Sequence, residues 1–486
     1  MRDFVPKPLF SLAEALKKET GKSLYLIGGK VRDYLAGFSM ASSDFDICAP
    51  VPAEIFMKTA LTSGFCADAA YARTGTMKIS LRQNGGNEKN DIKTEAEYAA
   101  FRSDKYVRGT HTPSETFFTE DILLDARRRD FTCNAVYYDI VADTFVDPLG
   151  GMKDIRNKLL RTVDKPGKVF GEDGLRLLRL ARFAGATGFS PTPETLDGAK
   201  NNAALIADVS PERIFAELKQ ILCSERKYGN ADGIYQALEI LDETRVLNGI
   251  FPDLAAGRNL KQRADFHNHD VLEHSLRAAA YSARANALAG VFPGVPVPFD
   301  VRLAALLHDI GKPAAYFRDG KFSDHPNVGA VLARAALEKL KAPVKTIKLV
   351  EALTKYHMYD YDLCTKENKL RKFIVLHYDI FNELLLVKQA DFSACKDDFS
   401  TAPSVTRLKN LADKMRAEGA PFTLKELAVR GNEIAPLLPS SRYVGATLEA
   451  LLLHCAVTPA DNTKERLLRL APSFAIVGEK NRNARL

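Results

Sequence analysis

Several features common in other protein classes are missing from this 486-residue sequence. Its seven cysteines form no CxxC pair, which argues against a zinc ribbon or a disulfide framework and favours reduced thiols. No apolar run is long enough to span a bilayer, and the first residues lack the apolar core of a signal peptide. We find no internal repeat and no low-complexity tract. These absences predict a cytoplasmic protein with no membrane contact.

What remains is an ordinary globular composition with a mild excess of basic charge. Hydrophobic residues make up 46% and charged residues 27%, which over this length allows several domains and a large core. The net charge of +7 permits a polyanionic partner without proving one. Short β-like runs alternate with helices to about residue 160, and helical periodicity dominates from about residue 170. We therefore expect an α+β fold, with a mixed-sheet head followed by a long all-α body.

The segment LYLIGGKVRDYLAGFSMASSDFDICA, residues 24–49, predicts a strand, a glycine turn, a helix and a second strand. Asp44 and Asp46 lie two apart on the second strand, so their side chains point to the same side. Such a pair suits Mg²⁺, which binds a few carboxylates together with substrate phosphates. Gly28 and Gly29 have no Cβ to hinder a triphosphate, and the helix after them offers amide groups. The pattern favours a two-metal centre for nucleotidyl transfer over a tight turn with two solvated carboxylates.

In this order, the motifs GGxVRD and DxD resemble the nucleotidyltransferase superfamily of DNA polymerase β. More narrowly, they resemble class II CCA-adding enzymes and bacterial poly(A) polymerases. The later segment ARRRDFTCNA, residues 126–135, is similar to the family motif RRDFTxNA, which contacts the sugar of the incoming nucleotide. The resemblance assigns that role to Arg129, Asp130 and Asn134, and it places Arg32 and Arg129 beside the triphosphate, for which guanidinium groups are well suited. A solvated basic turn is the alternative.

Residues 84–120 are polar and poor in long apolar runs, so we expect them to be partly mobile. In the family, residues 91–113 correspond to a flexible loop that full CCA-adding enzymes need to switch from C to A addition. The length of this loop here argues mildly against an enzyme that adds only C. Asp91 is either a third acidic group near the metals or an ordinary surface aspartate.

Residues 170–183, FGEDGLRLLRLARF, are predicted to form one helix from their apolar spacing. On such a helix Asp173 and Arg176 share a face. The order EDxxR after RRDFTxNA resembles the base-selecting motif of class II CCA-adding enzymes. There, a carboxylate accepts a hydrogen bond from the amino group of cytosine or adenine, and a guanidinium donates to the adjacent ring position. Arg179 and Arg182 join the nucleotide-binding candidates, and an exposed ion-pair network is the alternative.

Six of the nine histidines lie between residues 267 and 357. One histidine on an apolar helix is usually just packed, but the ordered set H…HD…H…H…D can hold divalent metal that delivers hydroxide to a phosphate ester. The set resembles the HD phosphohydrolase superfamily. The resemblance implies four ligands for a transition metal or Mg²⁺: His274, His308, Asp309 and Asp391. His325 and His357 match the positions of a possible second metal.

The C-terminal helices, residues 422–471, resemble the part of bacterial CCA-adding enzymes that grips tRNA. Earlier in the chain, the family segment ERI gives Arg213 a bracing role. We expect four parts: a nucleotidyltransferase head (1–160), a base-selecting helical neck (161–264), an HD domain (265–400) and a tRNA-binding helical tail (401–486).

The resulting hypothesis is a tRNA nucleotidyltransferase that adds CCA, from CTP and then ATP, without a nucleic-acid template. Its partners would be tRNA, CTP and ATP, with Mg²⁺ in the head, and the oligomeric state stays open between monomer and dimer. The HD domain would be a phosphohydrolase acting on RNA 3′ phosphates. One alternative is a poly(A) polymerase, or an enzyme of the same fold that adds only CC or only A. Another is an HD phosphohydrolase with an inert head.

Overall fold

The structure is a computed structural model, and it describes residues 4–39, 44–68, 75–83, 92–105, 115–291 and 295–483. Asp91 and the side chain of Asp44 lie outside the described residues. The chain divides into two compact units, Met1–Pro252 and Asp253–Leu486, which are described separately. No helix in the described ranges combines the length and the apolar character needed to cross a membrane.

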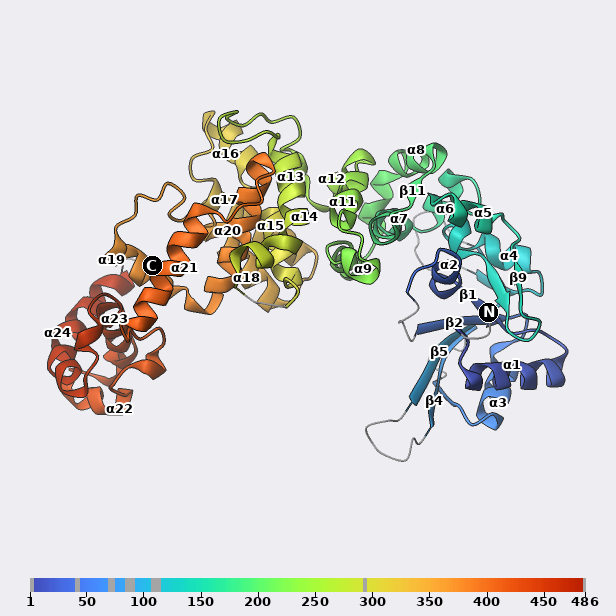
Figure 1. Ribbon diagram of the computed structural model, residues 1–486, viewed down its shortest axis with the longest axis horizontal. Coiled ribbons are helices and arrows are strands. Elements are labelled where there is room, and N and C mark those ends of the chain that lie inside the picture. Colours follow the sequence, from blue (N-terminus) through green and yellow to red (C-terminus); the bar gives the residue numbers. More distant parts are fainter. Residues whose placement is uncertain are drawn as a thin grey trace. The chain divides into compact units, whose positions relative to one another are not determined.

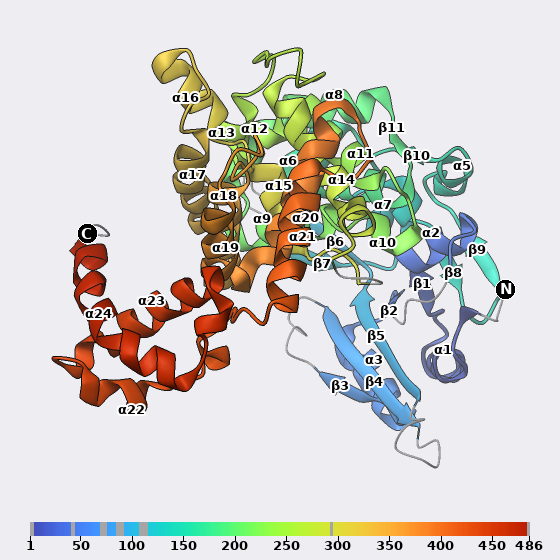
Figure 2. The same cartoon turned by 60° about the vertical axis from the view of Figure 1, so that its left-hand side comes forward.

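The first unit is built on a seven-stranded sheet with the strand order β3-β4-β5-β2-β1-β8-β9. Within it β2 and β5 run parallel, and the other neighbouring strands run antiparallel. Figure 2 shows the long β4–β5 pair. The sheet strands are β1 (Tyr25–Ile27), β2 (Asp44–Ala49), β3 (Cys66–Asp68), β4 (Thr76–Gln83), β5 (Ile92–Ala100), β8 (Tyr137–Asp139) and β9 (Thr144–Val146). Two further pairs are β6 (Arg102–Lys105) with β7 (Glu115–Phe118), and β10 (Leu159–Leu160) with β11 (Ser190–Pro191).

Helices and short turns connect these strands (Figure 1). They are α1 (Lys7–Thr20), α2 (Gly29–Leu35), α3 (Ala53–Thr62), α4 (Ile122–Arg127), the 3₁₀ turn η3 (Thr132–Asn134) and α5 (Gly151–Arg156). The predicted order of strand, glycine turn, helix and strand over residues 24–49 is confirmed as β1, Gly28, α2 and β2. On the covered face of the sheet, Tyr98 of β5 stacks on Phe56 of α3 with ring centroids 3.6 Å apart. The neighbouring Glu97 therefore points to the opposite face.

Within residues 84–120, which were expected to be partly mobile, residues 92–100 form β5, an interior strand that the sequence reading did not predict. Thr94, Ala96 and Tyr98 are buried and alternate with the exposed Glu95 and Glu97, which is the pattern of a half-buried strand. The buried positions carry mostly small side chains, so the apolar signal is weak. Residues 84–91 and 106–114 of the same segment lie outside the described ranges.

The helical neck completes the first unit. Its elements are α6 (Pro166–Glu172), α7 (Leu175–Thr187), α8 (Pro193–Asn201), η4 (Ala203–Asp208), α9 (Pro211–Ile221), α10 (Glu225–Tyr228), α11 (Gly233–Glu243) and α12 (Val246–Ile250).

The single helix predicted over residues 170–183 is wrong, because the chain breaks at Asp173 between α6 and α7. Asp173 is extended, with φ −147° and ψ 107°, and its Oδ1 accepts a hydrogen bond from the backbone N–H of Leu175. This bond satisfies a free amide at the start of α7. Gly174 follows because a Cβ there would lie 2.6 Å from the carbonyl oxygen of Leu205. The apolar spacing continues through the break and hides it.

The second unit is helical among its described residues, which confirms the predicted all-α body. Its elements are α13 (Pro252–Ala255), α14 (Val271–Ala289), α15 (Phe299–Leu307), α16 (Lys312–Asp319), α17 (His325–Lys339), α18 (Val344–Tyr356), α19 (Glu367–Leu376), η5 (Tyr378–Ile380), α20 (Phe381–Lys396), α21 (Pro403–Ala417), η6 (Leu424–Glu426), α22 (Gly431–Ile434), η7 (Ala435–Leu437), η8 (Ser441–Tyr443), α23 (Val444–Val457), η9 (Pro459–Asp461) and α24 (Lys464–Asn483). The helices α14 and α20 pack against each other along a largely buried face.

Helix α14 begins and ends at clear signals in the sequence. Asp270 accepts a hydrogen bond from the backbone N–H of Glu273 at its start, and Gly290 adopts the left-handed conformation at its end. These ends fix where the helix presents its buried His274.

Candidate functional sites

A row of charged side chains crosses the open face of the sheet. The strand register pairs Asp46 with Glu97, Glu97 with Lys78, and Lys78 with Asp68, on β2, β5, β4 and β3 respectively. Lys78 Nζ lies 2.8 Å from Glu97 Oε1. All four line a cavity of about 680 Å³, together with Gly29, Lys30, Asp33 and Lys227 among other residues. The arrangement puts several carboxylates and three lysines around one opening, which suits divalent cations and phosphate groups.

The glycine turn lies against the carboxylate row. Gly28 has φ +74°, and a Cβ at this position would lie 3.0 Å from Asp46 Oδ2. A side chain here would be strained by its backbone angle and would crowd the carboxylate. Gly29 opens α2 and lines the cavity. Asp44 stands two residues before Asp46 on β2, as predicted.

Arg32 is buried, and its guanidinium is bonded to protein groups. Its Nε and Nη2 donate to Asp33 Oδ1 at 3.0 and 2.6 Å, its Nη1 donates to Asn134 Oδ1 at 2.8 Å, and its Nη2 donates to the Tyr228 hydroxyl at 2.9 Å. The Tyr228 hydroxyl in turn donates to Asp33 Oδ2 at 2.5 Å. The guanidinium of Arg32 is thus bonded to Asp33, Asn134 and Tyr228. A contact between Arg32 and a triphosphate stays a prediction.

Asp130 joins the RRDFTCNA segment to helix α7. Its Oδ1 accepts from the Asn134 side-chain amide at 3.1 Å and from the backbone N–H of Phe131 at 2.8 Å, and its Oδ2 accepts from Arg179 Nε at 2.8 Å. Burial opposes the charge, but Arg179 and these hydrogen bonds outweigh it and hold the pKa of Asp130 well below its usual range. Arg182 lies over the ring of Phe183 and pairs with Glu217. The structure therefore brings Arg32, Asn134, Asp130 and Arg179 into one hydrogen-bonded chain.

Arg129 lies on the other side of this segment. Its Nη2 donates to Asp125 Oδ2 at 2.9 Å, and Arg128 pairs with Asp125 Oδ1 at 2.7 Å. Burial opposes the charge on Asp125, but the two arginines outweigh it and keep its pKa far below the ordinary value. Arg128 and Arg129 also line a second opening of about 380 Å³ that shares Asp46 with the first. A negatively charged ligand in this opening would lie between the arginines and the carboxylate row.

The two residues of the EDxxR motif are held in different ways. Asp173 Oδ2 pairs with Arg213 of α9 at 3.3 Å, which agrees with a bracing role for that arginine. Arg176 is buried; its Nη1 donates to the Val169 carbonyl and to Glu172 Oε2, and its Nη2 donates to the Arg128 carbonyl at 2.6 Å. These hydrogen bonds of Arg176 connect α7 to α6 and to the backbone of Arg128. Base reading by Asp173 and Arg176 stays a prediction.

In the second unit the structure brings together all six residues of the predicted HD set. Four imidazole Nε2 atoms converge on two carboxylates. His274 lies 3.1 Å from Asp391 Oδ1, His308 lies 3.2 Å from Asp309 Oδ2, and His325 and His357 lie 3.2 and 3.6 Å from Asp309 Oδ1. Lys312 Nζ adds a contact of 2.6 Å to Asp309 Oδ2. Three overlapping groups of these side chains have their ligand atoms within 4.8 Å of one another.

Backbone carbonyls orient three of the four rings. The Nδ1 atoms of His308, His325 and His357 lie 2.8, 2.8 and 2.7 Å from the carbonyl oxygens three residues earlier. A carbonyl only accepts, so each Nδ1 carries the hydrogen, and a neutral ring presents its Nε2 lone pair to the centre. Burial opposes a proton on His308, but Asp309 outweighs it and raises the pKa of His308 to about 10. Burial lowers the pKa of His357 to about 4. A divalent cation would take the place of the proton on His308.

Sequence reasoning missed several residues of these sites. Lys227 and Tyr228 reach the head from α10, and Glu97 reaches it from a strand that was not predicted. Only the alternation around Glu97 offered a signal. For Lys227 and Tyr228 there was none, because their position depends on how α10 packs against α2.

Known proteins resemble the chain along its length. Residues 24–161 match the family model of the poly A polymerase head domain, residues 188–257 match the probable RNA and SrmB-binding site of polymerase A, and residues 271–391 match the HD domain. An A-adding tRNA nucleotidyltransferase of Deinococcus radiodurans is 30% identical over 463 residues, covering 93% of this chain and 91% of the relative. A multifunctional CCA protein of Acinetobacter baumannii is 30% identical over 346 residues, or 69% of this chain and 74% of the relative.

Two solved structures of CCA-adding enzymes have a fold similar to that of this chain. The CCA-adding enzyme of Bacillus stearothermophilus in complex with CTP has a TM-score of 0.65 and 23% identity, with 99% of this chain and 100% of that one covered. The Thermotoga maritima CCA-adding enzyme complexed with tRNA has a TM-score of 0.60, 16% identity and 96% coverage of both chains. The chain is an enzyme with an HD domain, and it belongs to the family of class II CCA-adding tRNA nucleotidyltransferases and bacterial poly(A) polymerases.

Proposed function

We propose that the enzyme adds CCA to the 3′ end of tRNA, from CTP and then ATP, without a nucleic-acid template. The observation that carries the proposal is Asp46 on β2, which lies against the Gly28 turn and faces both openings of the head. The carboxylates and lysines around it match what a metal–triphosphate complex requires. The printed names of the relatives and the solved complexes support the same substrates.

We propose that Asp44 and Asp46 hold two Mg²⁺ ions: Asp46 lines the cavity, and Asp44 stands two residues before it on the same strand. Bound Mg²⁺ supplies activation of the tRNA 3′ hydroxyl and neutralises charge on the departing pyrophosphate. Gly28 leaves room beside Asp46, and Glu97 is the adjacent carboxylate in the sheet. Lys30 and Lys227 line the same cavity and would orient the phosphates from two sides.

We propose that Asp173 and Arg176 read the base, as the EDxxR resemblance implies. Asp173 Oδ2 pairs with Arg213 at 3.3 Å, and its carboxylate would accept a hydrogen bond from the amino group of cytosine or adenine. Arg176 would have to exchange one of its backbone carbonyl partners for the base. Asn134, Asp130 and Arg129 would hold the sugar and phosphates nearby.

The main test is nucleotide addition to three tRNAs that lack CCA, CA or only the final A, each supplied with single nucleotides. The proposal expects C addition to the first two and A addition to the third. Extension of the third tRNA alone would indicate an A-adding enzyme, the alternative favoured by the relative from Deinococcus radiodurans. Long A tails on all three would indicate a poly(A) polymerase. Asp46→Asn should abolish every addition while preserving the circular dichroism spectrum.

For the second unit, we propose an HD domain over residues 265–400 that hydrolyses phosphates at RNA 3′ ends with a bound divalent metal. Six convergent side chains, three with oriented rings, support the proposal. Hydrolysis of a 2′,3′-cyclic phosphate to a phosphomonoester, lost in Asp309→Ala, would test it. If Asp309→Ala still adds nucleotides to tRNA, then the two centres are independent. Addition failing in the wild type while hydrolysis remains would indicate an inert head.

We also propose that the chain divides into a head (1–160), a neck (161–264), an HD domain and a tail (401–486). The proposed location of the enzyme is the cytoplasm. The tail would bind the tRNA backbone through basic residues such as Lys425, Arg430 and Arg442. Binding measured at several salt concentrations would test this, because each phosphate contact makes the affinity more sensitive to salt.

A further inference from the structure

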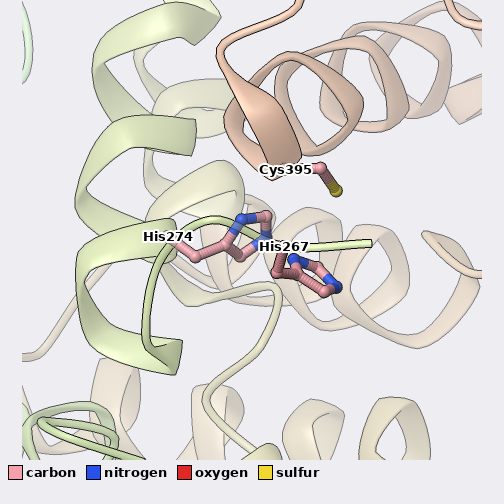
Figure 3. A group of neighbouring side chains, drawn as sticks. All are labelled: His267, His274 and Cys395. Atoms are coloured by element: carbon pink, nitrogen blue, oxygen red, sulfur yellow. The ribbon is translucent and has the colours of Figure 1, made fainter. Parts of the chain in front are cut away.

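His267 and Cys395 lie beside the HD centre and outside its predicted ligand set, and they meet at His274, which belongs to that set. His267 precedes α14, His274 lies within α14, and Cys395 lies near the end of α20 (Figure 3). One ligand atom from each lies within 4.8 Å of the other two. The two imidazole rings meet edge to face, with their centroids 4.9 Å apart. Three metal-binding groups from three separate segments thus converge on one point.

The contacts of His267 and Cys395 leave their ligand atoms available. The Nδ1 of His267 is buried and has no hydrogen-bond partner within the described part of the chain. The thiol of Cys395 is buried and has two long contacts, 3.9 Å to Asp391 Oδ1 and 4.0 Å to the Tyr361 hydroxyl. Thiols are weak hydrogen-bond donors, so these contacts offer little resistance to a metal.

The chemistry of this set differs from that of the HD centre. Two imidazoles and one thiolate suit a thiophilic ion such as Zn²⁺ or Cd²⁺, whereas the HD centre, which has two carboxylates and no thiol, would also suit Mn²⁺ or Mg²⁺. We propose that His267, His274 and Cys395 form a second, thiophilic metal site that competes with the HD centre for His274. Binding there displaces the thiol proton to solvent and leaves one coordination position for water.

The competition follows from the shared imidazole. His274 is fully buried between the two sets, and its Nε2 lies 3.1 Å from both His308 Nε2 and Asp391 Oδ1. His274 Nδ1 is buried and has no hydrogen-bond partner among the described residues. A neutral imidazole has one lone pair, so an ion bound by either nitrogen of His274 toward His267 and Cys395 would leave none for the HD metal. Thiophilic ions would therefore inhibit hydrolysis by removing one ligand of the active metal. The inference deepens the proposed HD function and depends on it only through His274.

The test is a Cd²⁺ titration of the full chain, followed by the ultraviolet charge-transfer absorption of a cadmium–thiolate bond. Cys66 and Cys364 are exposed free thiols, so every sample carries Cys66→Ser and Cys364→Ser. The matched pair of variants is Cys395→Ser and Cys455→Ser, which alter two buried cysteines of the same unit. The Cys455→Ser protein should keep the saturable band, and the Cys395→Ser protein should lose it.

Mn²⁺ binding keeps the result interpretable if a variant is perturbed. Cys395→Ser and His267→Gln should both bind Mn²⁺ within about twofold of the wild type, because neither residue belongs to the HD set. His267→Gln should weaken Cd²⁺ binding by about 10- to 100-fold, the scale expected for losing support at a metal site. Prebound Mn²⁺ should raise the apparent Kd for Cd²⁺.

Three results would overturn the site: a band of unchanged strength in Cys395→Ser, no band while Cd²⁺ binds the wild type, or unchanged Cd²⁺ affinity in His267→Gln. If Cys395→Ser loses Mn²⁺ binding as well, that variant is perturbed, and the Cd²⁺ titration of His267→Gln alone decides whether the thiophilic site exists. A Cd²⁺-binding protein that shows the band but opens no 2′,3′-cyclic phosphate to a phosphomonoester would refute the hydrolase proposal and leave the thiophilic site standing.

Discussion

Replacement of Arg32 by alanine tests whether this arginine supports the site or contacts the nucleotide. Its side chain is 1% exposed and pairs with Asp33, whose side chain is 7% exposed. Breaking a buried pair by removing one partner costs about 3–5 kcal/mol, because the other charge stays behind. In a unit of this size, each kcal/mol lowers the melting temperature by roughly 2–4 °C. Arg32→Ala should therefore lower the Tm of the first unit by roughly 6–20 °C.

The assay is thermal unfolding, with CTP binding measured in parallel at a temperature where all variants are folded. Arg156→Ala is the control: it removes an exposed arginine of the same unit and should change stability by less than about 0.5 kcal/mol. Adding Asp33→Asn to Arg32→Ala removes the stranded charge and should recover about 1–3 kcal/mol. If Arg32→Ala has the same melting temperature as Arg156→Ala yet binds CTP more weakly, the supporting role of Arg32 is refuted. Direct contact between Arg32 and CTP would then be indicated.

Three further predictions concern single charged groups of the first unit. The pKa of Asp125 is lower in the folded protein than in the unfolded chain, where it is about 4. Its ionised form therefore stabilises the fold above about pH 4, and this stabilisation is lost as the pH falls further. Asp125→Asn should flatten the dependence of the unfolding free energy on pH in that acidic range, and an unchanged slope would contradict a low pKa of Asp125. Lys227→Ala should raise the KM for CTP roughly fivefold at nearly constant kcat, whereas the exposed Lys200→Ala should not; equal kinetics of the two variants would exclude a phosphate contact. Arg213→Ala should reduce discrimination against UTP by up to about fivefold, since it removes a partly exposed partner of Asp173; unchanged discrimination in single-nucleotide assays would remove the bracing argument.

Local patterns allowed much of the head to be predicted from the sequence. The strand, glycine turn, helix and strand over residues 24–49 each depend on residues close in sequence, and all are confirmed. Strand β5 was missed because its buried face carries small residues such as Ala96, whose apolar signal is weak. The helix break at Asp173 was missed because apolar periodicity continues across it, although the Asp-Gly pair was a turn signal.

Contacts between distant residues lie beyond pattern reasoning. The bond between Arg32 and Tyr228 spans 196 positions, and nothing near either residue indicates the other. The HD set is different: its six residues lie between 274 and 391, and their order along the sequence resembles a known family closely enough to predict every one of them. What the order could not give was the orientation of the rings by backbone carbonyls.

The hydroxyl of Tyr228 connects α10 to Asp33 of α2, the helix that begins at the glycine turn. Because Asp33 accepts this bond, pairs with Arg32 and lines the cavity, a shift of α10 would change the charges around that cavity. Thermodynamic linkage makes the effect mutual: a triphosphate that favours one position of α10 is itself bound more tightly in that position. A single phenolic proton thereby joins a helix of the neck to the helix that opens at the glycine turn.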